Sequence, residues 1–213
     1  MKKQPPYPFK IGFLLSGSGS TLENLLEHIE KKKVEANVAV VISSKEACYG
    51  IERANNWGIT REKVNYKDFK NRVEEYSDQI TEILNRYHVD LVVLGGFLSL
   101  YLIPDQYKNR VINIHPALIP SFCGKGYYGR KVHESVIEYG VKYTGCTVHF
   151  VDNEYDSGPI IDQAIVRVEE SDSAESVENK VQQLEKEIYP RVIQAIVDSR
   201  VGIDGRKVFI KDQ

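Results

Sequence analysis

The chain has 213 residues, enough for one large domain or two small ones with a sizeable core. Hydrophobic residues make up 42% and charged residues 27%, and the net charge of -2 gives no general attraction to nucleic acid or anionic lipid. No apolar run reaches the roughly 18 residues of a membrane span, and no signal peptide is recognisable. Three cysteines without a Cys-x-x-Cys pair favour a reducing compartment. We therefore expect a cytoplasmic monomer or homodimer that takes small-molecule substrates and binds neither nucleic acid nor membrane.

Strands and helices alternate through the first half of the chain. Short apolar runs predict buried strands, which in chain order are 11–15, 38–42, 90–94 and 111–114, with a brief edge strand starting at Val64. Apolar residues at helical spacing predict helices between them, at 22–29, 51–57 and 68–87. This alternation indicates βαβ units. We therefore expect an α/β fold with an open, mostly parallel twisted sheet and helices on both faces.

The pattern changes after residue 128. In chain order the predicted elements are a helix at 130–139, a strand at 145–151, a turn at 153–159, a strand at 160–168 and an edge strand at 205–212. The two strands that flank the turn can pair as a hairpin. Ser173 is a predicted N-cap for a last helix that reaches about residue 199, and Pro190 is expected to kink or divide that helix. No repeat or linker interrupts these elements, so we expect a single domain, 1–213.

A glycine-containing loop, Gly17-Ser18-Gly19-Ser20-Thr21, joins the first strand to the first helix. Backbone N–H groups and the helix dipole favour an anion at such a position. A dinucleotide fingerprint needs its third glycine where this chain has Leu22, and no Gly-Lys-Ser/Thr of a Walker A loop follows. The loop is therefore a candidate site for one phosphate group, or else only a tight turn before a capped helix.

Two polar residues, Asn113 and His115, lie at the carboxyl end of a predicted parallel strand, where ligands of open α/β sheets bind. They share one face of the strand, so both can point at one reacting atom. Asp156 lies in a turn, where an aspartate is commonly just an Asx-turn residue. If folding brings it beside His115, it favours the imidazolium and raises the pKa of His115 from about 6.5. His149 is a further candidate, for support or orientation.

The residue types restrict the chemistry. No activated Ser or Cys nucleophile and no histidine–cysteine spacing of a metal site is evident, so we expect no metal. An amide, an imidazole and a carboxylate fit direct acyl transfer, in which an amine attacks a carbonyl, Asn113 and protonated His115 stabilise the oxyanion, and protons are relayed to the leaving nitrogen. A non-catalytic nucleotide-binding module is the alternative from another class, and the presence of Asn113, His115 and Asp156 together argues against it.

Several segments occur in the order found in a known family. They are Ser-Gly-x-Gly-Ser, Gly-Gly-Phe-Leu, Asn-Ile-His-Pro-Ala-Leu-Ile-Pro-Ser-Phe, Gly-Cys-Thr-Val-His-Phe-Val and Asp-x-Gly-Pro-Ile-Ile. From about Lys10 to Ala195 the chain resembles phosphoribosylglycinamide formyltransferase, a folate-dependent enzyme of purine biosynthesis. The resemblance implies a Rossmann-like fold and transfer of a formyl group from the co-substrate 10-formyltetrahydrofolate to the amine of glycinamide ribonucleotide. It also implies that the N-terminal half supplies the phosphate side and the C-terminal half completes the folate and catalytic site.

The family's substrate-binding positions can be carried over by motif. Its phosphate-binding positions match Gly19, Ser20 and Thr21. Its ribose-binding positions match Gln182 and Glu185, which without the resemblance would be assigned to an exposed helix face. Thr21 stands where the family commonly has Asn, a change that leaves binding through the backbone intact.

The family's folate contacts match Leu98, Ser99, Leu100, Tyr101 and Asn113. The resemblance also implies that three residues carry out the transfer, namely Asn113, His115 and Asp156. Ser99 stands where family members often have Arg, so the chain departs from the family at one folate contact.

The loop at 121–130 is longer than usual in the family. Within it, Lys125 is either a mobile cationic contact or a solvated loop residue. Two related activities are the alternatives: a sugar-nucleotide formyltransferase, and a 10-formyltetrahydrofolate hydrolase, which normally has an added N-terminal domain. An initiator-tRNA formyltransferase is not expected, because it needs a basic surface and an added C-terminal domain.

Overall fold

The computed structural model describes residues 4–212. The chain forms two compact units, Met1–Ile112 and Asn113–Gln213. The strand order of the main sheet is β3-β2-β1-β4-β5-β6-β7, and β8 and β9 form a separate two-stranded sheet. Strand β5 (Val111–His115) contains the boundary between the units. The expectation of a single domain stays a prediction.

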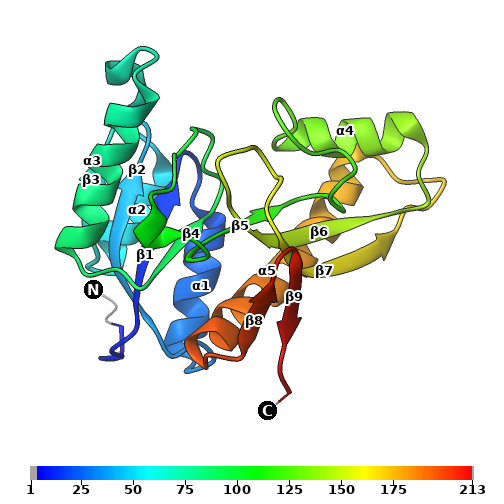
Figure 1. Ribbon diagram of the computed structural model, residues 1–213. Coiled ribbons are helices and arrows are strands. Elements are labelled where there is room, and N and C mark those ends of the chain that lie inside the picture. Colours follow the sequence, from blue (N-terminus) through cyan, green and yellow to red (C-terminus); the bar gives the residue numbers. More distant parts are fainter. Residues whose placement is uncertain (1–3, 213) are drawn as a thin grey trace. The chain divides into compact units, whose positions relative to one another are not determined.

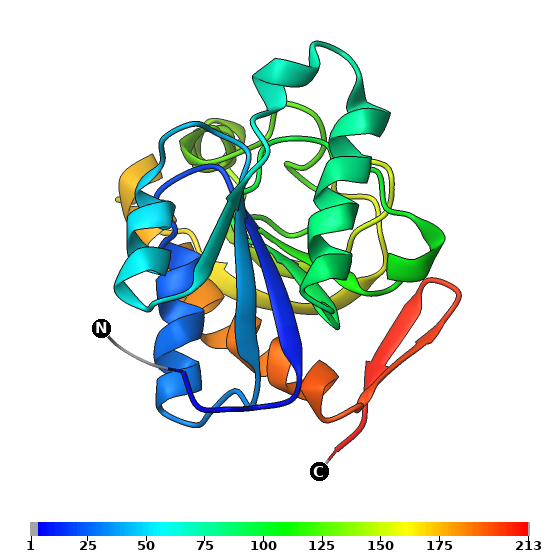
Figure 2. The same cartoon turned by 90° about the vertical axis from the view of Figure 1, so that its left-hand side faces the viewer.

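The first unit is a βα alternation, as the sequence predicts. Its elements are β1 (Lys10–Leu15), α1 (Ser20–Glu30), β2 (Asn37–Ser43), α2 (Tyr49–Asn56), β3 (Thr60–Lys63), the 3-10 turn η1 (Tyr66–Phe69), α3 (Val73–Arg86), β4 (Leu91–Leu94) and the 3-10 turn η2 (Asp105–Tyr107). Strand β1 pairs in parallel with β2 and β4, and β2 pairs in parallel with β3. Figure 2 shows α1 and α2 on one face of these strands and α3 on the other. The predicted α/β class with a mostly parallel sheet is confirmed.

Apolar side chains on both faces of β1 form the core of the first unit. Five of the six residues of β1 are buried. Helix α1 buries its whole apolar face, namely Leu22, Leu25, Leu26 and Ile29. Burying one such side chain stabilises a fold by roughly 1.5–3 kcal/mol, so this face fixes α1, and with it the loop that precedes α1, onto the strands.

Two predicted boundaries in the first unit are wrong. Strand β3 ends at Lys63, one residue before the predicted start at Val64. The third helix begins at Val73 instead of residue 68, because Lys70 and Asn71 have φ of 36° and 72°, in the left-handed region that ends a helix. These two residues separate η1 from α3.

The second unit is built on an antiparallel pair. Strands β6 (Tyr143–Phe150) and β7 (Ile160–Arg167) pair from Tyr143↔Arg167 to His149↔Ile160, which confirms the predicted hairpin. Helix α4 (Arg130–Tyr139) lies between two glycines with positive φ. Helix α5 (Ala174–Val197) packs against α4, β6 and β7, and Figure 1 shows it running along these strands.

The last helix begins and ends close to where the sequence places it. Ser173 accepts a hydrogen bond from the backbone N–H of Ser176, and the Ser176 hydroxyl accepts one from the backbone N–H of Ser173, so both side chains cap the helix. Pro190 is buried inside the helix and does not divide it. Among the described residues, no helix has the length and apolar character to cross a membrane.

A hairpin stands where the sequence predicts a single edge strand at 205–212. Strand β8 (Val201–Asp204) and strand β9 (Lys207–Ile210) pair antiparallel across a two-residue turn, Gly205-Arg206. Gly205 has φ of 59°, a conformation that glycine adopts at little cost, so the chain reverses inside the predicted strand.

Candidate active site

The carboxyl end of β5 carries the two polar residues that the sequence singles out. His115 is 3% exposed and Asn113 is half-buried, and they lie on one face of the strand because side chains alternate along it. Pro116 follows and ends the strand. Both residues belong to the second unit, as do Asp156 and His149.

The structure brings the histidine and the aspartate together. The Nδ1 atom of His115 lies 3.4 Å from Oδ2 of Asp156, whose side chain is 12% exposed. The other ring nitrogen, Nε2, lies 2.8 Å from the carbonyl oxygen of Phe122. Both ring nitrogens therefore face oxygen acceptors, so an imidazolium at His115 can donate on both sides.

His149 links the amide of Asn113 to this pair. Its Nδ1 lies 2.8 Å from the carbonyl oxygen of Phe150, so Nδ1 donates to that oxygen, and Nε2 is the ring nitrogen that faces Asn113 and Asp156. The amide nitrogen of Asn113 lies 3.3 Å from that Nε2 atom, and Oδ1 of Asp156 lies 3.7 Å from it. Nε2 of His149 therefore lies between the Asn113 amide and the Asp156 carboxylate, and the amide nitrogen of Asn113 has a second N–H besides the one that can face Nε2.

Burial and neighbouring charges act in opposite directions on the pKa values of His115 and Asp156. Burial lowers the pKa of His115 below its usual value, although the Asp156 carboxylate and the Phe122 carbonyl act in the opposite direction. The expectation that Asp156 raises the pKa of His115 above its usual value is therefore wrong for the net shift, because burial outweighs the carboxylate. Burial alone would raise the pKa of Asp156, but bonds and charges from His149, His115 and the Gly124 N–H lower it. At neutral pH the resting pair is a neutral imidazole beside a carboxylate.

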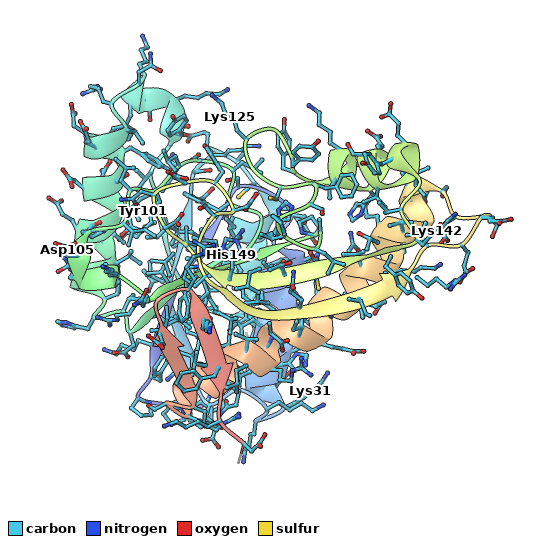
Figure 3. All side chains as sticks on the ribbon, turned by 45° about the vertical axis from the view of Figure 1, so that its right-hand side comes forward. Lys31, Tyr101, Asp105, Lys125, Lys142 and His149 are labelled. Carbon is cyan, nitrogen blue, oxygen red and sulfur yellow. The ribbon has the colours of Figure 1, made fainter. Side chains whose placement is uncertain are left out.

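Two backbone groups at this site are missed by sequence reasoning. The Phe122 carbonyl faces His115, and the backbone N–H of Gly124 donates to Oδ2 of Asp156 at 2.9 Å. Phe122 and Gly124 have φ of 49° and 90°, so the loop turns twice through the left-handed region to reach the pair. The glycines at 124 and 126 were the only sequence signal, since a sequence does not show where a backbone N–H points. Figure 3 shows Lys125 outside this group and His149 in the interior.

A buried threonine holds the segment that follows β5. The Thr147 hydroxyl donates to the Ala117 carbonyl at 2.7 Å and accepts from the Ile119 N–H at 3.1 Å. The side-chain amide of Gln163 donates to the same hydroxyl at 2.9 Å and to the Ile119 carbonyl at 3.2 Å. Strands β6 and β7 thereby fix the backbone between His115 and the loop that contacts it.

The glycine loop of the first unit has the form of an anion site. Gly19 precedes α1 with φ of 73°, and no side chain caps the helix start. A Cβ on Gly19 would lie 2.5 Å from the Cα of Gly50, so only glycine permits this close approach of two backbones. The first N–H groups of α1, at Ser20 and Thr21, point out of the helix with its dipole behind them.

Hydroxyl groups hold the predicted folate segment in the first unit. The backbone N–H of Leu98 donates to Oγ of Ser16 at 3.0 Å, while the Leu98 side chain is 48% exposed. Tyr101 is buried, with its hydroxyl 3.0 Å from that of Thr81. Ser99 and Leu100 are half-buried. The segment is therefore anchored at both ends and presents an apolar side chain to solvent.

The predicted ribose pair lies on α5 in the second unit. The Gln182 side chain is exposed, and its amide nitrogen lies 3.3 Å from Oε1 of Glu178. Burial, with a smaller contribution from the Glu178 charge, raises the pKa of Glu185 to about 7. A carboxyl whose charge is this costly is unusual on a helix face and fits a ligand-binding role.

The fold and these residues define an α/β enzyme that transfers an acyl group. The formyl transferase family matches residues 9–193, and the chain belongs to this family. Within it, the chain belongs with the phosphoribosylglycinamide formyltransferases, as the following relatives show.

Phosphoribosylglycinamide formyltransferase of Escherichia coli (strain K12) is 34% identical over 203 residues, which cover 94% of this chain and 92% of that protein. The crystal structure of glycinamide ribonucleotide transformylase 1 from Symbiobacterium toebii is 37% identical, with a TM-score of 0.89 over 98% of this chain and 96% of that one. The trifunctional purine biosynthetic protein adenosine-3 of Homo sapiens is 34% identical over 208 residues, or 96% of this chain. The chain spans only 20% of the length of that protein.

Proposed function

We propose that this chain transfers a formyl group from 10-formyltetrahydrofolate to the primary amine of glycinamide ribonucleotide, a step of purine biosynthesis. The observation that carries the proposal is the convergence of the Asn113 amide, the His115 imidazole and the Asp156 carboxylate within one unit. Membership of the formyltransferase family supports the pair of substrates.

In the first step the amine nitrogen attacks the formyl carbon. A carbon–nitrogen bond forms, and the π electrons of the carbonyl move to its oxygen. The free N–H of the Asn113 amide, held in its orientation by His149, donates to this oxyanion. Because the donor is positioned before the reaction, it stabilises the charge without reorganisation.

In the second step a proton moves from the attacking nitrogen to the leaving nitrogen. Neutral His115 accepts the proton, and the Asp156 carboxylate, 3.4 Å from its ring, stabilises the imidazolium. His115 then donates the proton to N10 of the folate as the carbon–N10 bond breaks and the carbonyl re-forms. The products are the formylated amine and tetrahydrofolate, and the enzyme returns to its starting state.

The binding positions follow from the same proposal. The helix start at Gly19, Ser20 and Thr21 receives the substrate phosphate, and Gln182 with Glu185 accepts and donates hydrogen bonds at the ribose hydroxyls. The anchored segment from Leu98 through Ser99 and Leu100 to Tyr101 receives the pterin. The cytoplasmic location, the absence of nucleic-acid partners and a monomeric or homodimeric state stay predictions of the sequence.

The test is a transfer assay with the purified chain and both substrates, in which release of deformylated folate is followed. His115→Asn should lower turnover by at least about 10², whereas His88→Asn, on an exposed residue with φ of 52° that Asn tolerates, should not change it. A reaction without glycinamide ribonucleotide measures hydrolysis. Equal folate release with and without the ribonucleotide would replace the proposal by a hydrolase.

A further inference from the structure

The loop that carries Asp156 is held in an unusual backbone conformation. Asp156 has φ of 53°, in the left-handed region, which costs a non-glycine residue roughly 1–2 kcal/mol. Such a conformation persists only where the surroundings fix it. Since the Asp156 carboxylate must meet His115 on one side and His149 on the other, the backbone of this loop decides the geometry of the site.

Each end of the loop is fixed locally. At its start, Oδ1 of Asp152 accepts from the backbone N–H of Glu154 at 3.0 Å. At its end, the Phe150 N–H donates to the Pro159 carbonyl at 2.9 Å. A Cβ on Gly158 would lie 1.8 Å from the Phe150 carbonyl oxygen, so the two backbones touch there. The residue between these ends, Asp156, is the one with the strained backbone.

A distant part of the chain reaches the middle of the loop. Arg206, at the tip of the β8–β9 hairpin, donates from Nη2 to the carbonyl of Ser157 at 2.7 Å. Ser157 directly follows Asp156, and its carbonyl belongs to the Ser157–Gly158 peptide group, so the bond holds the backbone one residue beyond Asp156. Among residues 4–212, Arg206 takes part in no ion pair, and this carbonyl is the partner that the structure gives it.

The hairpin is built to hold its tip in place. At its base, the Lys211 N–H donates to the Arg200 carbonyl at 3.0 Å, and the Arg200 side chain donates to the Lys211 carbonyl at 3.1 Å. Gly202 pairs with Phe209, and a Cβ on Gly202 would meet the Phe209 ring at 2.3 Å, so the ring covers the glycine. Strand β9 packs against β7. A two-stranded hairpin is marginal alone, and these contacts supply the missing support.

We propose that Arg206 is a positioning residue for Asp156, and that the β8–β9 hairpin fixes the loop that carries Asp156. The inference rests on the proposed role of Asp156 in formyl transfer. Without the Arg206 bond, the Ser157–Gly158 peptide group is held less firmly, and the Asp156 carboxylate spends less time beside the His115 ring. Transfer then slows, while the affinity for both substrates stays nearly the same.

The test compares Arg206→Ala, Arg206→Lys and a matched control, Lys207→Ala, which removes one exposed charge from the neighbouring hairpin position. Two quantities are measured: kcat and KM for transfer, and the pKa of His115 from its ring-proton NMR titration without substrates. Arg206→Ala should lower kcat by about fivefold, as expected for one exposed charge-assisted hydrogen bond, with KM within about twofold. The pKa of His115 should fall, because Asp156 supports its charge less. Arg206→Lys should restore part of kcat and part of the pKa of His115.

The outcomes separate the two hypotheses. If Arg206→Ala matches Lys207→Ala in both kcat and the pKa of His115, the positioning role of Arg206 is refuted. If the wild-type chain transfers no formyl group, the proposed function is refuted, and the NMR titration still decides whether Arg206 positions Asp156. A fall in thermal stability without a change in the pKa of His115 would show that the hairpin is only structural, and would also overturn the inference.

Discussion

Replacing Asp156 by Asn is the sharpest test of the proposed mechanism. The change removes the charge and keeps the size, and an amide oxygen can still accept from the Gly124 N–H, which now donates to the carboxylate at 2.9 Å. The fold should therefore survive. What is lost is the carboxylate 3.4 Å from the ring nitrogen that becomes charged during transfer.

The size of the effect follows from that distance. Two unit charges 3.4 Å apart attract by about 5 kcal/mol at an effective dielectric of about 20. Each charge is shared over two atoms, only one of which is near the other group, so about half of this, roughly 2.5 kcal/mol, stabilises the imidazolium in the transition state. At about 1.4 kcal/mol per tenfold in rate, kcat should fall by about 10².

The assay measures kcat against pH for Asp156→Asn, the wild type and a control, Asp152→Asn, which removes a charge from the same loop away from His115. The neutral ring accepts the proton, so turnover falls as pH drops through the pKa of His115. Loss of the carboxylate lowers that pKa further, so this acidic limb should move to lower pH. A variant that keeps near-wild-type kcat and an unmoved limb would show that Asp156 has no part in proton transfer.

Further outcomes are expected at other positions. Asn113→Ala should lower kcat by about 10²–10³ with little change in KM, as steady-state kinetics can show, because an oxyanion donor is lost. The affinity for glycinamide ribonucleotide should improve as pH rises through about 7, where Glu185 ionises and can accept from the ribose. Glu185→Gln should abolish this dependence in a calorimetric titration series. Thr147→Val should lower the free energy of unfolding in urea by about 1–3 kcal/mol, because the buried Ile119 N–H and the Gln163 amide lose their shared acceptor.

The sheet could be predicted because its strands are buried on both faces. A short apolar run such as the one in β1 is typical of a strand buried on both faces, and glycine or serine marks where it ends. The end of the chain could not be predicted in this way. Gly205 lies in a segment of mixed polarity, and such a segment is compatible with either a strand or a turn. The Phe209 ring covers Gly202 on the other strand, and the local sequence pattern does not show a contact between two strands.

The polar residues of the site could be listed from the sequence, but their convergence could not. Asp156 meets His115 only because the β6–β7 register sets where the connecting loop begins and ends, and because Gly158 lets that loop pass against Phe150. The backbone groups of Phe122 and Gly124 are contributed by conformation and not by side-chain type. The family resemblance supplied the pairing that residue types alone left open.

The direction of the His115 pKa shift was beyond sequence reasoning for a related reason. A carboxylate beside an imidazole raises its pKa, and burial of the same ring lowers it, so the net shift depends on how much water the fold excludes. In this fold burial is the larger influence, so in the proposed mechanism the ring is neutral until the amine gives it a proton. The carboxylate then stabilises a charge that exists only during the reaction, and an interaction confined to the transition state accelerates a reaction more than one already present at rest.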